Sequence, residues 1–251
     1  MPYVDLNCDL GESFGRYTLG LDDQVIPLIT SANIACGMHA GDPLVMRRTV
    51  EMATRAGIAI GAHPGYPDLQ GFGRRDMRLS PDEAYAFVSY QIGALAAFCK
   101  QQGTRLHHVK PHGQMYNRAA LDKDFAQAIA QAVYDFDPSL ILVGLGNGKL
   151  IDAGKETGLR TAGEFFTDRN YTDEGTLVPR TQDKAMITDE SFAVKRAIRA
   201  VTQGNIESVS GKTIPVCADT ICVHGDGTKA LEFVKTIKAA LQEAGVELKA
   251  L

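Results

Sequence analysis

Short apolar runs alternate along the chain with longer segments that have helical periodicity. The runs are rich in Val and Ile and have the length of buried strands. This alternation is typical of repeated β-α units around a parallel sheet. Seven strands are predicted, at 3–7, 32–36, 59–62, 106–110, 140–145, 160–165 and 220–224.

Start and stop signals bound the predicted helices. Ser80 and Glu83 form a capping box with proline at the first helical position, which predicts a helix that ends near residue 103. Asp42 precedes a second proline and predicts a helix over 42–57. Further helices are expected at 122–136, 148–157, 188–203 and 228–243, and a short hairpin at 206–217.

The order of the elements favours one domain over residues 1–251. A chain of 251 residues lies at the upper edge of what one hydrophobic core organises. Two connections, 64–79 and 166–180, are too long for simple turns, and connections of this length in compact domains tend to cover or bind ligands.

Polar side chains follow nearly every predicted strand. An open sheet would place a ligand site at one switch point only, whereas a closed barrel brings every strand end to one mouth. We therefore expect a single-domain seven-stranded β/α barrel. The strand-end residues include Asn7, Asp9, Glu12, His39, His63, Lys110, His112, Glu164 and His224.

The first strand alternates polar and apolar residues. Asp5, Asn7 and Asp9 share one face of the pleat, which faces the interior of a barrel. Either Asp5 and Asn7 hydrogen-bond to neighbouring backbone and Asp9 caps a turn, or Asp9 or Glu12 acts as a general base or metal ligand.

The other strand ends carry basic side chains. His39 lies among glycines before a helix, and His63 and Lys110 each precede a proline that rigidifies the loop. A lysine inside a barrel carries an anionic substrate, transfers protons with a lowered pKa, or forms an ion pair, here with Asp5 or Glu164. His107 and His108 are interpreted mostly as packing or surface residues.

The two long connections carry arginines that can bind carboxylate or phosphate, Arg74, Arg75, Arg78, Arg169 and Arg180. The glycine-rich turns near 144–149 and 225–229 do not match the phosphate loop G-x-x-x-x-G-K-[ST], so no such ATP site is expected.

Charge and composition exclude several classes of protein. The formal charge is −4 and no basic stripe is present, which argues against nucleic-acid binding. No apolar stretch approaches a membrane span and no signal peptide is apparent, so a cytoplasmic protein is expected. The five cysteines are interpreted as buried hydrophobes, with a nucleophilic role for Cys8 or Cys36 as the alternative.

Long ordered strings resemble the family of 5-oxoprolinase A subunits, also called LamB/YcsF. The resemblance covers nearly the whole chain. The strings are DLNCDLGE (5–12), SANIACGMHAGDP (31–43), GAHPGYPDLQGFGRR (61–75), HVKPHGQMYN (108–117), TDRNYTDEGTLVPR (167–180) and ICVHGDG (221–227).

The resemblance implies a barrel related to polysaccharide deacetylases and glycoside hydrolases. It also implies ATP-dependent opening of 5-oxo-L-proline to L-glutamate, together with partner subunits B and C. Because the chain lacks a phosphate loop, we expect ATP chemistry to lie at least partly on the partners. This chain would then hydrolyse the activated lactam.

Lactam hydrolysis requires a base for water, an acid for the leaving nitrogen and stabilisation of negative charge. We predict Asp9 as the base, Lys110 as the stabilising cation, and acid and orienting roles for His39, His63 and His112. Substrate binding is predicted for Asn7, Glu12, Asn33, Arg74, Glu164, Arg180 and His224.

Two alternatives stay open. Asp9, His39 and His63 could hold a divalent ion, as Asp and His do in the related deacetylases, so a metal-dependent deacetylase of amides or sugars is the second hypothesis. A non-catalytic binding or regulatory subunit is the third.

Overall fold

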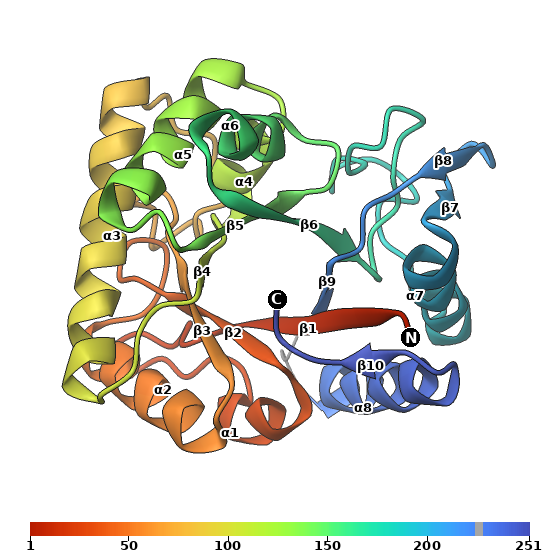
Figure 1. Ribbon diagram of the computed structural model, residues 1–251, viewed down its shortest axis with the longest axis horizontal. Helices are drawn as coiled ribbons and strands as arrows, with labels where there is room; N and C mark the ends of the chain where they lie inside the picture. Colours follow the sequence, from red (N-terminus) through yellow and green to blue (C-terminus); the bar gives the residue numbers. More distant parts are fainter. Residues whose placement is uncertain (224–227) are drawn as a thin grey trace.

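Seven parallel strands close into a barrel in the computed structural model, which describes residues 1–223 and 228–251 (Figure 1). The order is β1-β2-β3-β4-β5-β6-β9, and β9 pairs back with β1, which confirms the predicted barrel. Asn7 therefore lies opposite Ser31 on one side and Cys222 on the other. The barrel strands are β1 (Tyr3–Leu10), β2 (Ser31–Ala35), β3 (Ala59–His63), β4 (His108–Val109), β5 (Ile141–Leu145), β6 (Arg160–Phe166) and β9 (Thr220–Val223).

Helices surround the barrel and begin at the predicted caps. The Asp42 carboxylate accepts hydrogen bonds from the backbone of Leu44 and Val45, and Ser80 and Glu83 form both bonds of a capping box. The predicted helices are α2 (Pro43–Ala56), α3 (Pro81–Gln101), α5 (Lys123–Phe136), α6 (Lys149–Thr157), α7 (Glu190–Gln203) and α8 (Thr228–Glu243).

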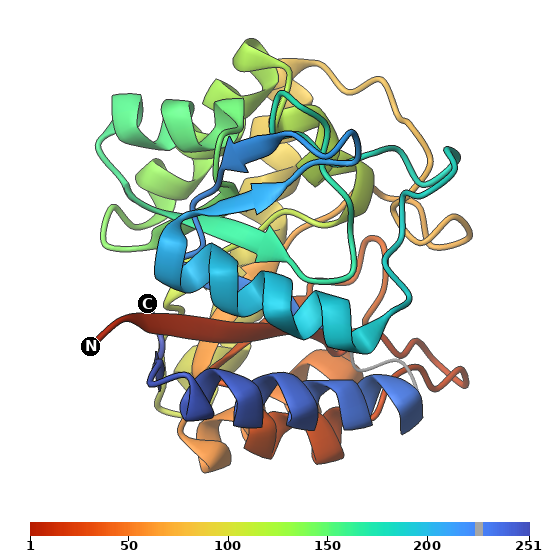
Figure 2. The same ribbon diagram turned by 90° about the vertical axis from the view of Figure 1, so that its right-hand side faces the viewer.

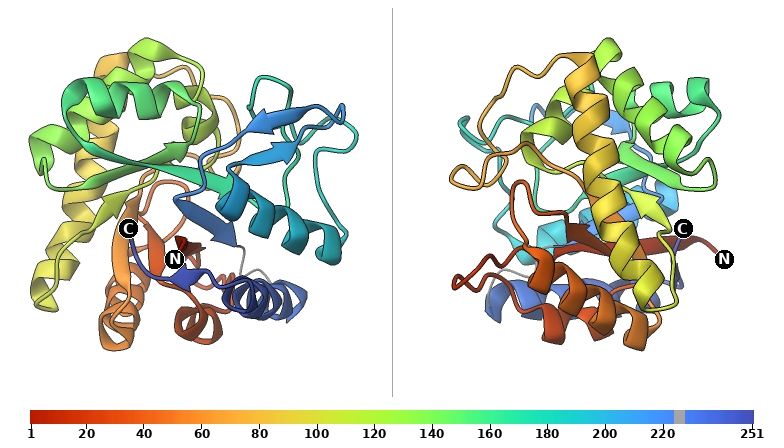
Figure 3. Two further views of the ribbon diagram at one scale, coloured as in Figure 1. Left: turned by 45° about the vertical axis from the view of Figure 1, so that its right-hand side comes forward. Right: turned by 90° about the vertical axis from the view of Figure 1, so that its left-hand side faces the viewer.

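Several short elements were not predicted. They are α1 (Asp22–Val25), the 3-10 helix η1 (Ile26–Leu28), α4 (Gly113–Ala119) and β10 (Glu247–Leu248), which extends the sheet beside β1. The expected hairpin is present as β7 (Asn205–Glu207) and β8 (Thr213–Pro215), which lie beside α7 (Figure 3).

Strand β4 is shorter than predicted. The amides of His107 and Lys110 still donate to the carbonyls of Ile60 and Ala62, so the pairing continues beyond both ends of the strand. The amide of His112 also donates to the carbonyl of Pro64 at 2.8 Å, so the contact between the two segments extends past Pro111. Both Lys110–Pro111 and His63–Pro64 are trans, since no cis peptide bond occurs in the described chain.

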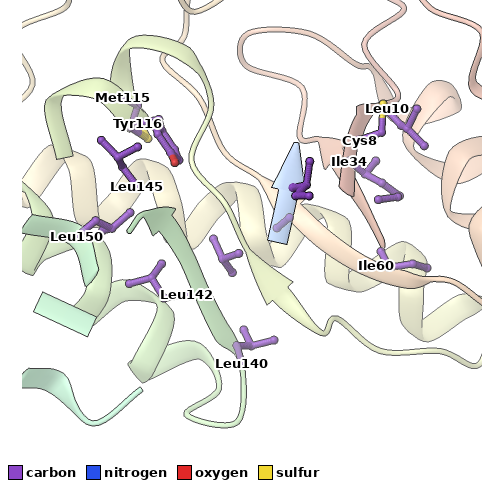
Figure 4. Close-up of a cluster of buried hydrophobic side chains, with 14 of the residues drawn as sticks. Cys8, Leu10, Ile34, Ile60, Met115, Tyr116, Leu140, Leu142, Leu145 and Leu150 are labelled. Atoms are coloured by element: carbon purple, nitrogen blue, oxygen red, sulfur yellow. The ribbon is translucent and has the colours of Figure 1, made fainter. Parts of the chain in front are cut away.

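The hydrophobic core lies between the barrel and the helices. Leu6 and Cys8 on β1 are fully buried in it, and Figure 4 shows Leu142 and Leu145 of β5 near Leu150 of α6. The apolar residues of β1 alternate with Asp5, Asn7 and Asp9, so packing the former outward turns the latter into the barrel.

The barrel has two different ends. Both termini lie at one end, and the long connections 64–80 and 167–189 project from the other, where the strands end (Figure 2). No helix in the described part of the chain is long and apolar enough to cross a membrane.

Candidate active site

The inner face of β1 carries three polar side chains with different surroundings. Asp5 accepts hydrogen bonds from the hydroxyls of Thr30, Ser31 and Thr220. Burial raises the pKa of Asp5, although these hydroxyls oppose the shift. Asp5 is thus held by side-chain hydroxyls and not by the neighbouring backbone that was expected, while Asn7 and Asp9 point toward a network at the mouth.

Lys110 is the centre of that network. Its Nζ lies 2.8 Å from Asp9 Oδ1, 2.8 Å from Glu164 Oε1 and 3.1 Å from Asn7 Oδ1. Of the two ion pairs considered, the one with Glu164 is present, and Asp9 takes the place of Asp5. Asn33 donates to Asp9 Oδ1 at 2.9 Å and to Asn7 Oδ1 at 2.7 Å.

The two partners keep each other charged. Burial acts to lower the pKa of Lys110, but the carboxylates of Asp9 and Glu164 outweigh it and hold the pKa well above the ordinary value. Burial acts to raise the pKa of Asp9, but His63 and Lys110 outweigh it and hold it well below the usual range. Lys110 is thus a cation and not a lysine with a lowered pKa.

Three histidines and one carboxylate converge beside Asp9. His63 Nε2 lies 3.3 Å from Asp9 Oδ2 and 3.0 Å from His112 Nδ1. Glu12 Oε1 lies 3.2 Å from His39 Nε2 and 3.5 Å from His112 Nδ1. The rings of His39 and His112 stack in parallel with centroids 3.7 Å apart.

This cluster could hold a metal ion. Glu12, His39, His63 and His112 each offer a ligand atom, and these atoms all lie within 4.8 Å of one another. These candidate ligands differ from the predicted ones, which were Asp9, His39 and His63. One carboxylate oxygen of Asp9 contacts Lys110 and Asn33, and Glu12 is the carboxylate that contacts His39 and His112. Burial lowers the pKa of His112 to about 3 and that of His39 well below its ordinary value, and neutral imidazole is the metal-binding form.

Loop backbone in unusual conformations places these side chains. Gly11 has φ +68°, which ends the alternation of β1 and lets Glu12 reach the histidines. Phe72 has φ +54°, a conformation uncommon for residues other than glycine, and its carbonyl accepts a hydrogen bond of 2.9 Å from His112 Nε2. A Cβ on Gly65 would lie 2.5 Å from His39 Nδ1, so only glycine leaves room for that ring.

Of the two histidines interpreted mostly as packing or surface residues, His108 is the buried one. It lies inside the barrel, and its Nε2 donates to Asn33 Oδ1 at 2.8 Å. Its neighbour His107 instead contacts the carbonyl of Leu251. The alternation itself carried the signal, because His108 and Lys110 are two residues apart and share a face. Cys222, whose Sγ lies 3.5 Å from Lys110 Nζ, was also missed.

The predicted arginines differ in position. Arg74 is exposed, lies 5.1 Å above the ring of Phe72, and acts electrostatically on His39 and His112. Burial lowers the pKa of Arg180, and the charge of Arg74 adds to the shift. Arg75 is paired with Asp68. His224, also predicted to bind substrate, lies outside the described residues.

The expectation of buried cysteines is wrong for Cys217, which is exposed, and Cys8 and Cys36 have no features of nucleophiles. Cys8 and Cys36 are buried, and burial raises the pKa of the Cys8 thiol well above its ordinary value and that of Cys36 to about 12. Both are therefore thiols at neutral pH, and the alternative of a nucleophilic role is wrong.

Comparison with known proteins places this chain in a family. The model of the LamB/YcsF family matches residues 4–251. The chain belongs to the LamB/YcsF family. A LamB/YcsF relative from Clostridium beijerinckii, named as the A subunit of 5-oxoprolinase, is 56% identical over 248 residues, which are 99% of this chain and 97% of the relative.

Solved structures agree with this placement. The lactam utilization protein from Thermus thermophilus is 47% identical, with a TM-score of 0.94 over 99% of this chain and all of that one. The T48 deacetylase is 12% identical, with a TM-score of 0.50 over 98% of this chain and 87% of that one. The second likeness shows that the LamB/YcsF barrel shares the fold of a deacetylase, and no more.

Proposed function

We propose that this chain is the A subunit of an ATP-dependent 5-oxoprolinase, which cleaves 5-oxo-L-proline to L-glutamate. The observation that carries the proposal is the full-length similarity to relatives named as 5-oxoprolinase A subunits, at 53% to 56% identity. The lactam utilization protein of the same fold supports a cyclic amide as the substrate class. The proposal places the chain in the cytoplasm, where its five free cysteines stay reduced.

The charged groups at the mouth suit the hydrolysis of an activated lactam. Water must lose a proton as it attacks, and the carbonyl oxygen must gain negative charge. Asp9 is ionised and partly accessible, with its side chain 19% exposed, so it can accept the proton. Lys110 is the adjacent buried cation and can stabilise the developing oxyanion.

The two roles are coupled. As long as Lys110 pairs with Asp9, it keeps the carboxylate a weak base. If the ammonium turns toward the developing oxyanion, the basicity of Asp9 rises at the moment when water gives up its proton. Asn7, Asn33 and Glu164, which hydrogen-bond to this pair, would fix its geometry against the substrate.

The remaining predicted residues surround the reacting groups. His39 and His112 are neutral at neutral pH, so we assign them orienting roles beside Glu12, with His63 closest to Asp9. Arg74 and Arg180 lie in the two long connections and would bind the carboxylate or a phosphoryl group of the substrate. His224 stays a predicted substrate ligand.

Partner proteins would supply the activation. The word subunit in the names of the relatives implies further subunits, and we propose subunits B and C as the partners. ATP would phosphorylate the lactam oxygen at least partly on those partners. This chain then receives the activated lactam and adds water.

Reconstitution with and without partners tests the proposal. We expect lactam opening only in the presence of ATP and the partner subunits, and a loss of about 10²–10⁴-fold in rate for Asp9→Asn. His107→Gln, at the opposite end of the barrel, is the matched control and should keep the rate. Full turnover of ATP and 5-oxoproline by this chain alone would refute the division of labour. A near-normal rate for Asp9→Asn would refute its role, and amide or sugar deacetylation without ATP would favour the alternative hypothesis.

A further inference from the structure

Two histidines at the mouth have their outer nitrogens fixed by backbone carbonyls. His63 Nδ1 lies 2.6 Å from the carbonyl oxygen of Lys110, and His112 Nε2 lies 2.9 Å from that of Phe72. A carbonyl oxygen only accepts, so both of these nitrogens carry hydrogen. In the neutral rings the other two nitrogens, His63 Nε2 and His112 Nδ1, therefore carry lone pairs.

These two lone pairs face each other across 3.0 Å. Two acceptors cannot form a hydrogen bond, so this approach is repulsive unless a positive charge lies between them. The positive charge is either one shared proton or a metal ion. A carbonyl that fixes the outer nitrogen is also the usual companion of a metal-bound histidine, because it orients the ring and selects the tautomer.

The formal charge of the contacting groups around the histidines favours the metal ion. Asp9, Glu12 and Glu164 bring three carboxylates, and Lys110 brings one ammonium, which leaves −2 with neutral histidines; the guanidinium groups of Arg74 and Arg180 are exposed and lie outside this sum. The side chain of Glu12 is only 8% exposed and that of Glu164 is fully buried. Buried charges are costly unless compensated. A divalent cation neutralises the group, whereas a single proton leaves it at −1.

The third donor is Glu12. Its Oε1 lies 3.5 Å from His112 Nδ1, on the side of the lone pairs. His39 has a different role, because its Nδ1 is buried without a hydrogen-bond partner. If His39 bound a metal through Nε2, the hydrogen on Nδ1 would be left unsatisfied. Donation from Nε2 to Glu12 at 3.2 Å instead places the ring's hydrogen in a hydrogen bond, leaves only a lone pair on Nδ1, and orients the carboxylate.

We propose that His63 Nε2, His112 Nδ1 and the Glu12 carboxylate bind a divalent cation such as Zn²⁺, and that His39 positions Glu12. Two histidines and one carboxylate are a donor set of zinc hydrolases, in which a fourth position stays open. Such an ion acidifies a bound water and polarises carbonyl oxygens. The inference is independent of the proposed function, because binding is measured on this chain without substrate or partners.

Metal binding by the purified chain tests the inference. After chelation and dialysis, titration with Zn²⁺ in a calorimeter and elemental analysis should give one tightly bound ion per chain. Co²⁺ in place of Zn²⁺ should give the visible absorption of a site with nitrogen and oxygen donors. Zn²⁺ should also raise the melting temperature of the wild-type protein.

Four variants separate the roles of the residues. Glu12→Gln and His112→Gln should weaken Zn²⁺ binding by more than about 100-fold, and His39→Gln by about 10–100-fold, as expected for a residue that orients a ligand. His107→Gln is the matched control and should bind as the wild type does. Melting temperatures of the metal-free proteins establish that each variant is folded.

Two results would overturn the inference. One is the absence of stoichiometric Zn²⁺ or Co²⁺ from the folded wild-type chain, which would leave the shared proton as the explanation. The other is unchanged affinity in Glu12→Gln or His112→Gln. Neither result bears on whether the reconstituted complex opens a lactam, so failure of this inference and failure of the proposed function are distinguishable.

Discussion

Among single residues, Lys110 has the most demanding environment. An ammonium group taken out of water costs several kcal/mol, and the structure compensates with two carboxylates at 2.8 Å. Such an arrangement is not an efficient way to stabilise a fold, because apolar residues of similar volume would serve as well. Its presence at the strand ends, open to the mouth on the side of Asp9, is what makes a catalytic role the better explanation.

His108 gives a pH-dependent contribution to stability with a definite sign. Burial, and then the charge of His107, hold the pKa of His108 well below its ordinary value. Below about pH 6.5 the unfolded chain takes up a proton at this residue and the folded chain does not. Stability from a neutral His108 is therefore complete above that pH and is lost as the pH falls, by at most about 1.4 kcal/mol per pH unit.

Comparison with His108→Gln isolates this contribution. Glutamine can still donate to Asn33 but does not titrate. We expect the difference in free energy of unfolding between wild type and variant to be largest near neutral pH and to shrink toward about pH 5. Urea denaturation of the metal-free proteins at both values measures it. A difference that stays constant would mean that His108 titrates alike in the folded and unfolded chain.

At the scale of elements, α2 links the loop after β1 to the loop after β2. Asp42 caps the helix through Oδ1 and accepts a further bond of 2.8 Å from the amide of Gly15 through Oδ2. The segment that carries Glu12 and the helix that follows His39 are thus joined by one carboxylate. Asp42 therefore joins two loops in addition to capping the N-terminus of α2.

Asp42→Ala should therefore cost more than the loss of an ordinary cap. We expect about 1–2 kcal/mol in the free energy of unfolding, since one change removes the helix cap and the bond to the neighbouring loop. Asp189→Ala, which removes the cap of α7 and a bond from the Ser191 hydroxyl in the same turn but no bond to another loop, should cost less. Equal losses in chemical denaturation would show that the bond to Gly15 contributes nothing.

The long elements could be predicted from sequence because their physical causes are local. Buried parallel strands need continuous apolar runs, and the caps of α2 and α3 each depend on a few adjacent residues. The missed helix α4 has no such signal: it is seven residues long, and the residue before it, His112, forms no cap with its side chain. Its place is decided by the tertiary structure.

The candidate site could be predicted only in part, for a related reason. Alternation on β1 predicts that Asp9 faces inward, and that holds. It predicts nothing for Glu12, whose direction depends on the left-handed turn at Gly11, or for the Phe72 carbonyl, which is set by a loop far away in sequence. The candidate metal site depends on those two features. Sequence spacing alone therefore predicted Asp9 as its carboxylate ligand, whereas the structure places Glu12 among the histidines.

At the scale of the whole molecule, closure of the barrel between β1 and β9 joins the two ends of the chain. Thr220 lies at this seam and is fully buried. Its hydroxyl donates to Asp5 Oδ2 and accepts a bond of 2.6 Å from Asn7 Nδ2. The same side chain thus connects the structural carboxylate at the base of β1 to the network around Lys110.

Thr220→Val should destabilise the pairing of β1 with β9 without splitting the chain into parts that unfold separately. The substitution keeps the shape of the side chain but leaves one carboxylate oxygen and one amide hydrogen without that partner, at a cost of about 1–3 kcal/mol. If residues 1–251 form one domain, as we propose, β1 and β6 belong to the same closed sheet and unfold together. Chemical denaturation should then show one transition at a lower midpoint, and hydrogen exchange should show equal losses of protection in β1 and β6. Two separate transitions, or loss of protection in β1 alone, would mean that the N-terminal strands and the later strands are distinct folding units that merely contact each other at the seam.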